Sequence, residues 1–174
     1  MAEKKVTTEM VKALREKTGA GIMDCQRALA DAAGDAQKAE AILREKGIAS
    51  AGKKSERETK QGLVEAYIHG GRIGALVELN CETDFVARTD QFKDLARSVA
   101  MQVAAMNPRF LAKDEVTAEQ RGDLSDKEVE STSLLSQPYI RDESKTIEEL
   151  IKATIATTGE NIRIGRFARF ELGR

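Results

Sequence analysis

The apolar positions of residues 1–50 recur at the spacing of short helices. They predict a first helix capped by Thr7 or Thr8, a second from about Met23 to Ala33, and a third from Ala36 to Lys46. A glycine follows each helix, as is typical of helix C-termini because glycine readily adopts positive φ: Gly19, Gly34 and Gly47. We therefore expect a separate three-helix module over residues 1–50.

Residues 51–62 are polar and charged, which predicts an exposed linker after this module. The segment Gly47–Lys53 matches the G-x-x-x-x-G-K pattern of a phosphate-binding loop. However, Lys54 stands where that loop needs a Ser or Thr to hold magnesium, and a helix rather than a strand precedes it. The match is therefore interpreted as accidental, and no nucleotide or other cofactor is predicted for this chain.

From residue 63 onward the hydrophobic period changes to that of strands. Leu63–His69 and Ile73–Cys81 are predicted to pair as a hairpin, since Gly70 and Gly71 supply its turn. The second strand alternates as a half-buried strand should, with one face formed by Ile73, Ala75, Val77, Leu79 and Cys81. A helix is predicted from about Asp90 to Met106, with an apolar stripe of Phe92, Leu95, Ala96, Val99 and Val103.

A second helix-and-strand unit ends the sequence. Thr146 and Glu149 form a capping box, and Gly159 stops the helix that they begin. The strand from Asn161 to Leu172 is predicted to carry one apolar face, made of Ile162, Ile164, Ala168, Phe170 and Leu172. Arg166 interrupts that face, which predicts a bulge near Gly165. With residues 108–143 as a variable connection, residues 63–174 form the core of an α+β fold, a three-stranded antiparallel sheet packed with helices.

The corner between the second strand and the long helix carries an unexpected aromatic residue. Thr83 and Asp84 are good helix-capping residues, because their side-chain oxygens accept backbone N–H groups. Phe85 follows them, and two interpretations stay open. The ring either packs into the core as a hydrophobic staple, or points outward to enter a partner.

Composition limits the classes of function. The formal charge of −1 argues against a general nucleic-acid binder, whose surface would be basic. No apolar run has the length of a membrane span, and no secretory signal is visible, so we expect a cytoplasmic protein. Cys25 and Cys81 are expected to be reduced and semi-buried. With one histidine, His69, beside a turn, their spacing fits no zinc site, and no metal site is predicted.

Four motifs then point to one family. Its TDFV signature resembles Thr83-Asp84-Phe85-Val86, and its N-terminal signature resembles residues 14–25. A later signature of the family resembles residues 137–140 together with 144–146, and its closing strand resembles residues 166–173. In this order they cover nearly the whole chain, which is similar to the short form of the elongation factor Ts family. The three helices predicted for residues 1–50 of this chain resemble a ubiquitin-associated domain. The resemblance also implies that residues 108–143 are shortened.

The resemblance implies a guanine-nucleotide exchange factor without covalent catalysis, which acts on elongation factor Tu in its GDP-bound and nucleotide-free states. It implies that Thr83, Asp84, Phe85 and Val86 wedge near the partner's magnesium ion. It also implies that the N-terminal module docks on the partner's G domain. Ile22 and Met23, which follow the Gly-rich turn of this module, either pack in the core or touch that partner. The whole candidate segment is Thr18, Gly19, Ala20, Gly21, Ile22 and Met23.

Two other classes of function remain open at this stage, as does the state of assembly. The helical module could serve as a plain interaction module without exchange activity, and Cys81 or Cys25 could serve a hydrolase. No direct nucleic-acid or membrane partner is predicted. A homodimer giving a two-to-two complex is expected to pack sheet to sheet through Phe170 and Leu172, with Arg163 and Arg169 on the opposite, solvated face.

Overall fold

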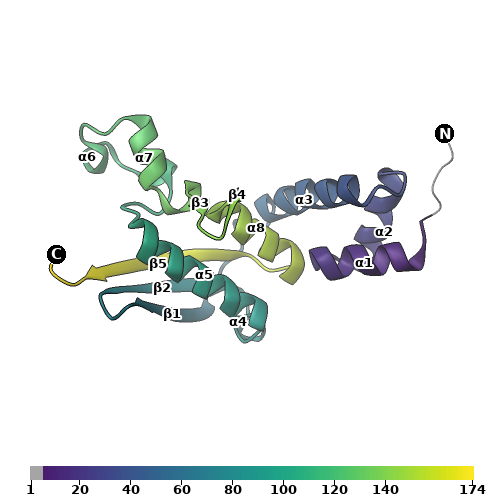
Figure 1. The fold of residues 1–174 in the computed structure, drawn as a ribbon, viewed down its shortest axis with the longest axis horizontal. Coiled ribbons are helices and arrows are strands. Elements are labelled where there is room, and N and C mark those ends of the chain that lie inside the picture. The colour runs from purple at the N-terminus through teal and green to yellow at the C-terminus, as the bar shows by residue number, and fades with distance from the viewer. Residues whose placement is uncertain (1–5) are drawn as a thin grey trace.

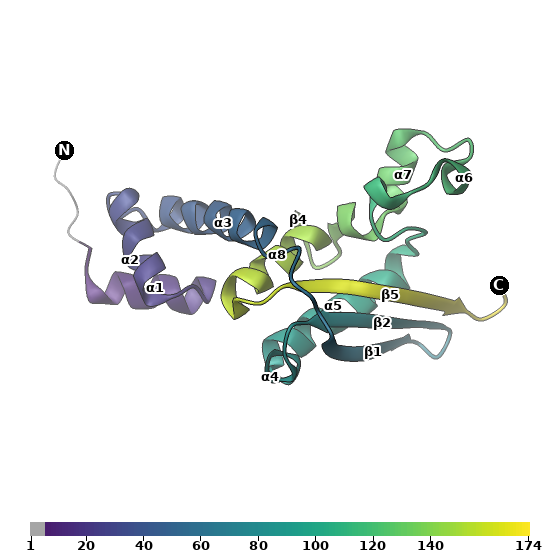
Figure 2. The same cartoon turned by 180° about the vertical axis from the view of Figure 1, so that it is seen from behind.

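The computed structural model describes residues 6–174, apart from the side chains of residues 48 and 50. At one end of an elongated molecule lie α1 (Thr8–Thr18), α2 (Ile22–Asp31) and α3 (Ala36–Gly52), as Figures 1 and 2 show. The three predicted helices are thus confirmed. Thr7 accepts a hydrogen bond from the amide of Met10 and caps α1. The module buries a small cluster of its own: Leu14, Cys25, Ala28, Leu29, Ala32 and Ala39.

The third helix is longer than predicted, and the expectation that Gly47 ends it is wrong. Gly47 lies in the middle of α3, where a Cβ would come within 3.0 Å of the Ala156 Cβ in α8 (Ile147–Thr158). The glycine therefore allows two helices to approach closely, instead of ending one. Ala51, near the end of α3, is buried in the main core. Most of the phosphate-loop match, up to Gly52, is helical, so it forms no such loop.

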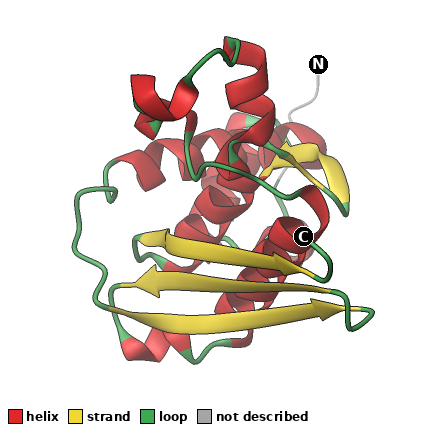
Figure 3. Cartoon of the chain, turned by 90° about the vertical axis from the view of Figure 1, so that its left-hand side faces the viewer, coloured by secondary structure: helices red, strands yellow, loops and turns green. Residues whose placement is uncertain are grey.

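The sheet has the order β1-β2-β5, with β1 (Gln61–His69), β2 (Ile73–Cys81) and β5 (Ile162–Glu171) all antiparallel, side by side in Figure 3. Helix α5 (Asp90–Met106) has the predicted bounds and packs with α8 against one face. The alternation predicted for β2 is confirmed, because its inward residues are buried against the apolar stripe of α5: Ala75, Val77, Leu79 and Cys81. The α+β fold class is confirmed.

The bulge predicted in the last strand is present, but its consequence for the strand's faces was missed. Leu79 pairs with Ile164 whereas Glu78 pairs with Arg166, so Gly165 is the extra residue. The side-chain alternation shifts by one position there. Ile164 faces the helices, but beyond the bulge Phe170 faces solvent.

The same shift corrects the arginines. Arg169 was expected on a solvated face, yet its side chain is largely buried and its Nε donates to the Ala104 carbonyl at 3.0 Å. Arg163 was expected opposite Phe170, yet the pairing places both on the outer face: Arg163 lies beside Asn80 and Phe170 beside Gly74.

The connection before α8 contains more structure than the sequence analysis predicted. It holds η1 (Lys113–Glu115), α6 (Ala118–Arg121), α7 (Asp126–Thr132) and η2 (Leu134–Ser136), then a separate ribbon of β3 (Pro138–Tyr139) and β4 (Asp142–Thr146). Capping boxes at Thr117 and Ser125 begin α6 and α7, and these were readable signals. The predicted capping box at Thr146 and the stop at Gly159 are confirmed for α8.

Candidate functional site

The corner after β2 presents its aromatic ring to solvent. Thr83 caps α4 (Asp84–Ala87), a single turn, by accepting a hydrogen bond from the Val86 amide at 3.4 Å. Val86 and Ala87 are buried and fix the turn to the core, whereas 78% of Phe85 is exposed. The interpretation of Phe85 as a buried staple is therefore wrong, because its neighbour Val86 takes the inward position.

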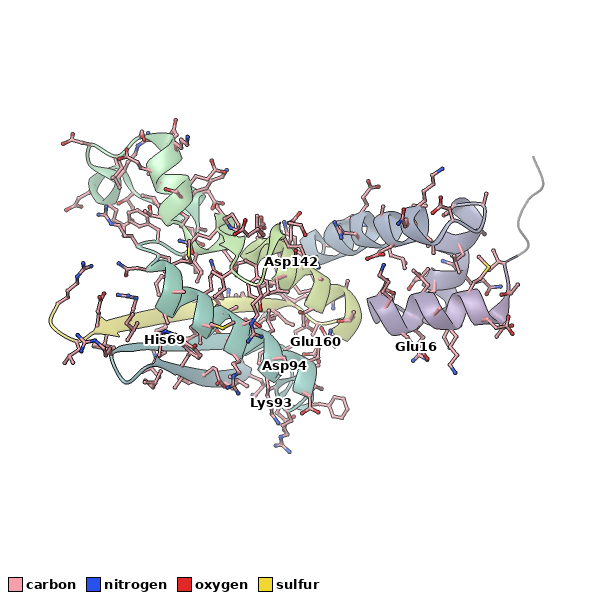
Figure 4. All side chains as sticks on the ribbon, viewed as in Figure 1. Glu16, His69, Lys93, Asp94, Asp142 and Glu160 are labelled. Atoms are coloured by element: carbon pink, nitrogen blue, oxygen red, sulfur yellow. The ribbon has the colours of Figure 1, made fainter. Side chains whose placement is uncertain are left out.

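A carboxylate from a distant part of the chain holds this corner. Glu160 accepts two hydrogen bonds from Thr83, one from the backbone amide at 3.0 Å and one from the hydroxyl at 2.6 Å. Beside it, Glu82 accepts from the Asn161 amide at 2.6 Å. Figure 4 labels Glu160, which stands next to Gly159, the residue that caps the C-terminus of α8. Sequence reasoning missed this residue, since no local pattern links positions that stand 77 residues apart.

The remaining polar groups of the corner are accounted for in the structure. The Asp84 carboxylate forms an exposed ion pair with Arg88 at 2.7 Å. The Cys81 thiol donates to the Thr83 carbonyl at 3.1 Å. Burial, with a further contribution from the Glu160 charge, raises the pKa of Cys81 to about 11. Such a thiol stays protonated near neutral pH and is a poor nucleophile, which argues against a hydrolase that uses Cys81.

The N-terminal candidate segment is a turn with two exposed apolar side chains. Gly19, with a φ of 69°, ends α1, and Gly21 begins α2 without a side-chain cap. Ile22 and Met23 are 56% and 59% exposed, so the interpretation that places them in the core is wrong. Beneath the turn, the buried Cys25 thiol donates to the Ala20 carbonyl at 3.7 Å.

The other candidate groups form no reactive site. His69 stacks on Tyr67 beside the hairpin turn, where the Tyr67 hydroxyl and His69 Nδ1 lie 3.2 Å apart. Within residues 6–174, no three His, Cys, Asp or Glu side chains gather as metal ligands would. None of the helices described here is both long and apolar enough to cross a membrane.

Comparison of the amino-acid sequence with those of known proteins points to one family. A family profile described as Elongation factor TS matches residues 4–124, which include both the corner and the N-terminal turn. Elongation factor Ts of Synechocystis is 50% identical over 200 aligned residues, which cover 99% of this chain and 91% of the relative. The protein of that name from Carboxydothermus hydrogenoformans is 48% identical over 194, covering 97% and 89%.

A further relative is longer than this chain. Elongation factor Ts of Gloeothece citriformis is 52% identical over 200 aligned residues, which cover 99% of this chain but 69% of the relative. That alignment exceeds the 174 residues of this chain, so the relative carries residues within the aligned span that this chain lacks. The profile spans both candidate segments, and the alignments with the named relatives cover nearly the whole chain, so the chain belongs to the elongation factor Ts family.

Proposed function

We propose that this translation factor binds elongation factor Tu and accelerates the release of its GDP. The observation that carries the proposal is the exposed Phe85 ring on a one-turn helix that is pinned at its base. Exposed large apolar side chains on a rigid support are typical of partner-binding sites, because their burial stabilises a complex. The site of action is then the cytoplasm, where translation takes place.

The corner would act as a wedge near the partner's magnesium ion. Phe85 enters an apolar slot, and burying such a ring contributes about 1.5–3 kcal/mol. Asp84, now paired with Arg88, enters the polar network around the ion. Mg²⁺ requires near-ideal octahedral geometry, so a small displacement of its ligands weakens it and leaves the diphosphate less neutralised. By linkage, GDP weakens the binding of this protein by the factor with which the protein weakens GDP.

The N-terminal turn would provide the docking contact. The exposed side chains of Ile22 and Met23 offer an apolar surface next to the backbone of residues 18–21. Methionine suits such a surface because its unbranched, polarisable side chain adapts to the partner. Docking through residues 18–23 supplies affinity, while residues 83–86 supply the displacement of GDP.

The release of a fluorescent GDP analogue from elongation factor Tu, followed by stopped flow, tests this function. Phe85→Ala should lower the rate of release at saturating factor by at least about tenfold, since each factor of ten corresponds to about 1.4 kcal/mol of lost transition-state stabilisation. Its thermal midpoint should stay close to that of the parent, because an exposed ring contributes little to folding. Met106→Ala, which truncates an exposed side chain on α5, is the control and should leave release unchanged.

Unaltered GDP release by the Phe85→Ala variant would refute the wedge. Binding of elongation factor Tu by both the parent and the variant, with no effect of either on GDP release, would instead indicate a plain interaction module.

The outer face of the sheet supports a proposal about assembly. Five large apolar side chains are exposed on this face and at its end: Val64, Ile68, Leu76, Phe170 and Leu172. We propose that a second copy covers them about a two-fold axis, so that a dimer engages two copies of elongation factor Tu. Sedimentation across micromolar concentrations should show concentration-dependent dimers and two-to-two complexes. A strict monomer that forms one-to-one complexes would contradict this arrangement.

A further inference from the structure

We propose that Glu160 is a positioning residue for exchange: it holds Thr83, and through Thr83 it fixes the direction in which Phe85 points. This inference rests on the proposed function of the corner. Glu160 itself need not touch elongation factor Tu.

The first argument is that α4 cannot fix its own orientation. It has four residues, and a single helical turn in isolation is unstable because nucleation is costly. Its direction must therefore come from contacts at its two ends and from the burial of Val86 and Ala87. At the C-terminal end the Thr89 hydroxyl donates to the Val86 carbonyl at 2.7 Å. At the N-terminal end the long-range contact is Glu160.

The second argument is the geometry of the clamp. The two oxygens of one carboxylate accept from two groups of one residue, the Thr83 amide and hydroxyl, which restrains rotation as well as position. Hydrogen bonds to a charged acceptor are stronger than neutral ones. The same hydroxyl accepts from the Val86 amide. A hydrogen-bonded chain thus runs from the Glu160 carboxylate to the residue directly after Phe85.

The third argument is that this clamp continues the sheet by other means. Backbone pairing between β2 and β5 ends at Cys81 and Ile162. Just beyond it, Glu160 accepts from the amide of Thr83, and Glu82 accepts from the amide of Asn161. Side-chain carboxylates therefore replace the carbonyl groups of a further ladder step. The corner therefore leaves the end of β2, the central strand, where charge-assisted hydrogen bonds hold it.

The fourth argument is that one short segment, residues 157–160 at and just beyond the end of α8, contacts both proposed partner-binding regions. Thr157, in the last turn of α8, lies against Gly19, where an added Cβ would come within 3.0 Å of its Cγ2. Its hydroxyl also accepts a hydrogen bond from Gln91 in the first turn of α5. Glu160 follows three residues later. The segment 157–160 therefore links the position of the N-terminal turn to that of the corner.

Stopped-flow GDP release tests the inference through kcat and KM separately. Glu160→Ala should lower kcat about tenfold and change KM for the GDP complex of elongation factor Tu by less than about twofold, because docking residues are untouched. Glu160→Gln should lie between, since its amide oxygen still accepts from one group of Thr83. Glu143→Gln, at an exposed position of β4, is the matched control and should behave as the parent.

A double-mutant cycle asks whether Glu160 acts through Thr83. Thr83→Ala removes the hydroxyl that joins Glu160 to the Val86 amide, so it should lower kcat at least as far as Glu160→Ala does. The double variant should lose less than the sum of the two single losses, because the hydrogen bond between the Thr83 hydroxyl and Glu160 is common to both. Thr83→Ser keeps the hydroxyl and should restore most of kcat. Strictly additive losses would overturn the assignment, since they would mean that the two residues act independently.

A readout in the free protein separates this inference from the proposed function. The chain has five Phe residues, so fluorophenylalanine labelling gives a simple ¹⁹F spectrum in which Phe85→Leu identifies one resonance. In Glu160→Ala that resonance should shift or sharpen as the corner loosens, whereas the resonance of the buried Phe92 should not change. An unchanged Phe85 resonance would overturn the inference, whereas normal GDP release by Phe85→Ala would refute the proposed function.

Discussion

The corner at residues 83–86 and the turn at residues 18–23 both expose apolar side chains, yet they are held in place by contacts of different range. One residue 77 positions away in the chain, Glu160, fixes Thr83. The hydrogen bonds of the turn are local: the Thr18 hydroxyl donates to the Leu14 carbonyl at 2.7 Å and accepts from the Ala20 amide at 3.3 Å. Its long-range contact, Gly19 against Thr157 of α8, is packing without a hydrogen bond. The comparison shows that the proposed wedge is held by charge-assisted hydrogen bonds to a distant part of the chain, whereas the proposed docking surface is held by local hydrogen bonds and by packing against α8.

Each region also has a buried cysteine beneath it, and the two thiols offer the largest expected difference between the regions. Cys81 donates to the carbonyl of Thr83, and Cys25 to that of Ala20. Thiol labelling at pH 8 of the single-cysteine variants Cys25→Ala and Cys81→Ala should show Cys81 reacting on the order of a hundredfold more slowly than Cys25. One reason is the raised pKa of Cys81, and the other is that the corner above Cys81 is held more firmly than the turn above Cys25. Equal rates would show that both regions open alike.

The raised pKa of Cys81 also predicts a dependence of stability on pH. Burial raises it from an ordinary value of 9.0 to about 11, so the folded chain keeps a proton that the unfolded chain loses between these values. This group's contribution to stability is therefore fully present below about pH 9 and is lost as the pH rises toward 11. The free energy of unfolding, measured by denaturant titration at each pH, should fall more steeply between pH 9 and 11 for the parent than for Cys81→Ala.

The second largest effect should come from charge placed on the docking surface. Ile22→Asp combined with Met23→Asp should weaken binding to elongation factor Tu by about tenfold or more, while GDP release at saturation stays near the parent rate. Gln26→Glu, an exposed position on the same helix, is the control. Calorimetric titration measures the affinity. A loss of kcat with unchanged affinity would reverse the roles given to the two regions.

A smaller effect is expected where α3 packs against α8. Gly47→Leu should cost about 1–3 kcal/mol in the free energy of unfolding, because its side chain would collide with Ala156 of α8. Gly52→Ala is the matched control on the same helix, since no atom lies within 4 Å of its added Cβ. It should be neutral or should stabilise by up to about 1 kcal/mol. Denaturant unfolding distinguishes them, and equal behaviour would mean that α3 and α8 do not support each other.

The smallest effect should come from the exposed ion pair of the corner. Arg88→Ala removes the partner of Asp84 and should change stability by less than about 0.5 kcal/mol, as surface pairs usually do. Thermal unfolding measures it. A larger loss would show that the corner depends on its local ion pair as well as on Glu160.

Local patterns predicted local structure well. The capping pair Thr146 and Glu149, the alternation along β2 and the apolar stripe of α5 all depend on residues close in sequence, and all are confirmed. The exposed position of Phe85 could be proposed from its place at a strand-to-helix corner, but not decided. That decision depended on whether Phe85 or Val86 would face the core.

What could not be predicted depends on contacts between distant residues. Gly47 has the local character of a helix stop, and its close approach to Ala156 of α8 exists only in the folded chain. Glu160 looks like an ordinary residue after a helix, and its contact with Thr83 exists only after β5 pairs with β2. The orientation of Phe170 differs from the expectation because the bulge at Gly165 moves every later side chain of β5 to the other face.

The bulge at Gly165 makes the surface of the sheet depend on the number of residues as much as on their kind. Because successive side chains of a strand alternate, one extra residue acts as a half-period phase shift for everything that follows it. Deleting Gly165 alone would turn Phe170 toward the helices and bring Arg169 out to solvent, with every other residue of the strand retained. The β5 part of the outer face would then present Phe167, Arg169 and Glu171 in place of Arg166, Ala168 and Phe170. A change of one residue in length can therefore alter the chemistry of this surface without a single substitution.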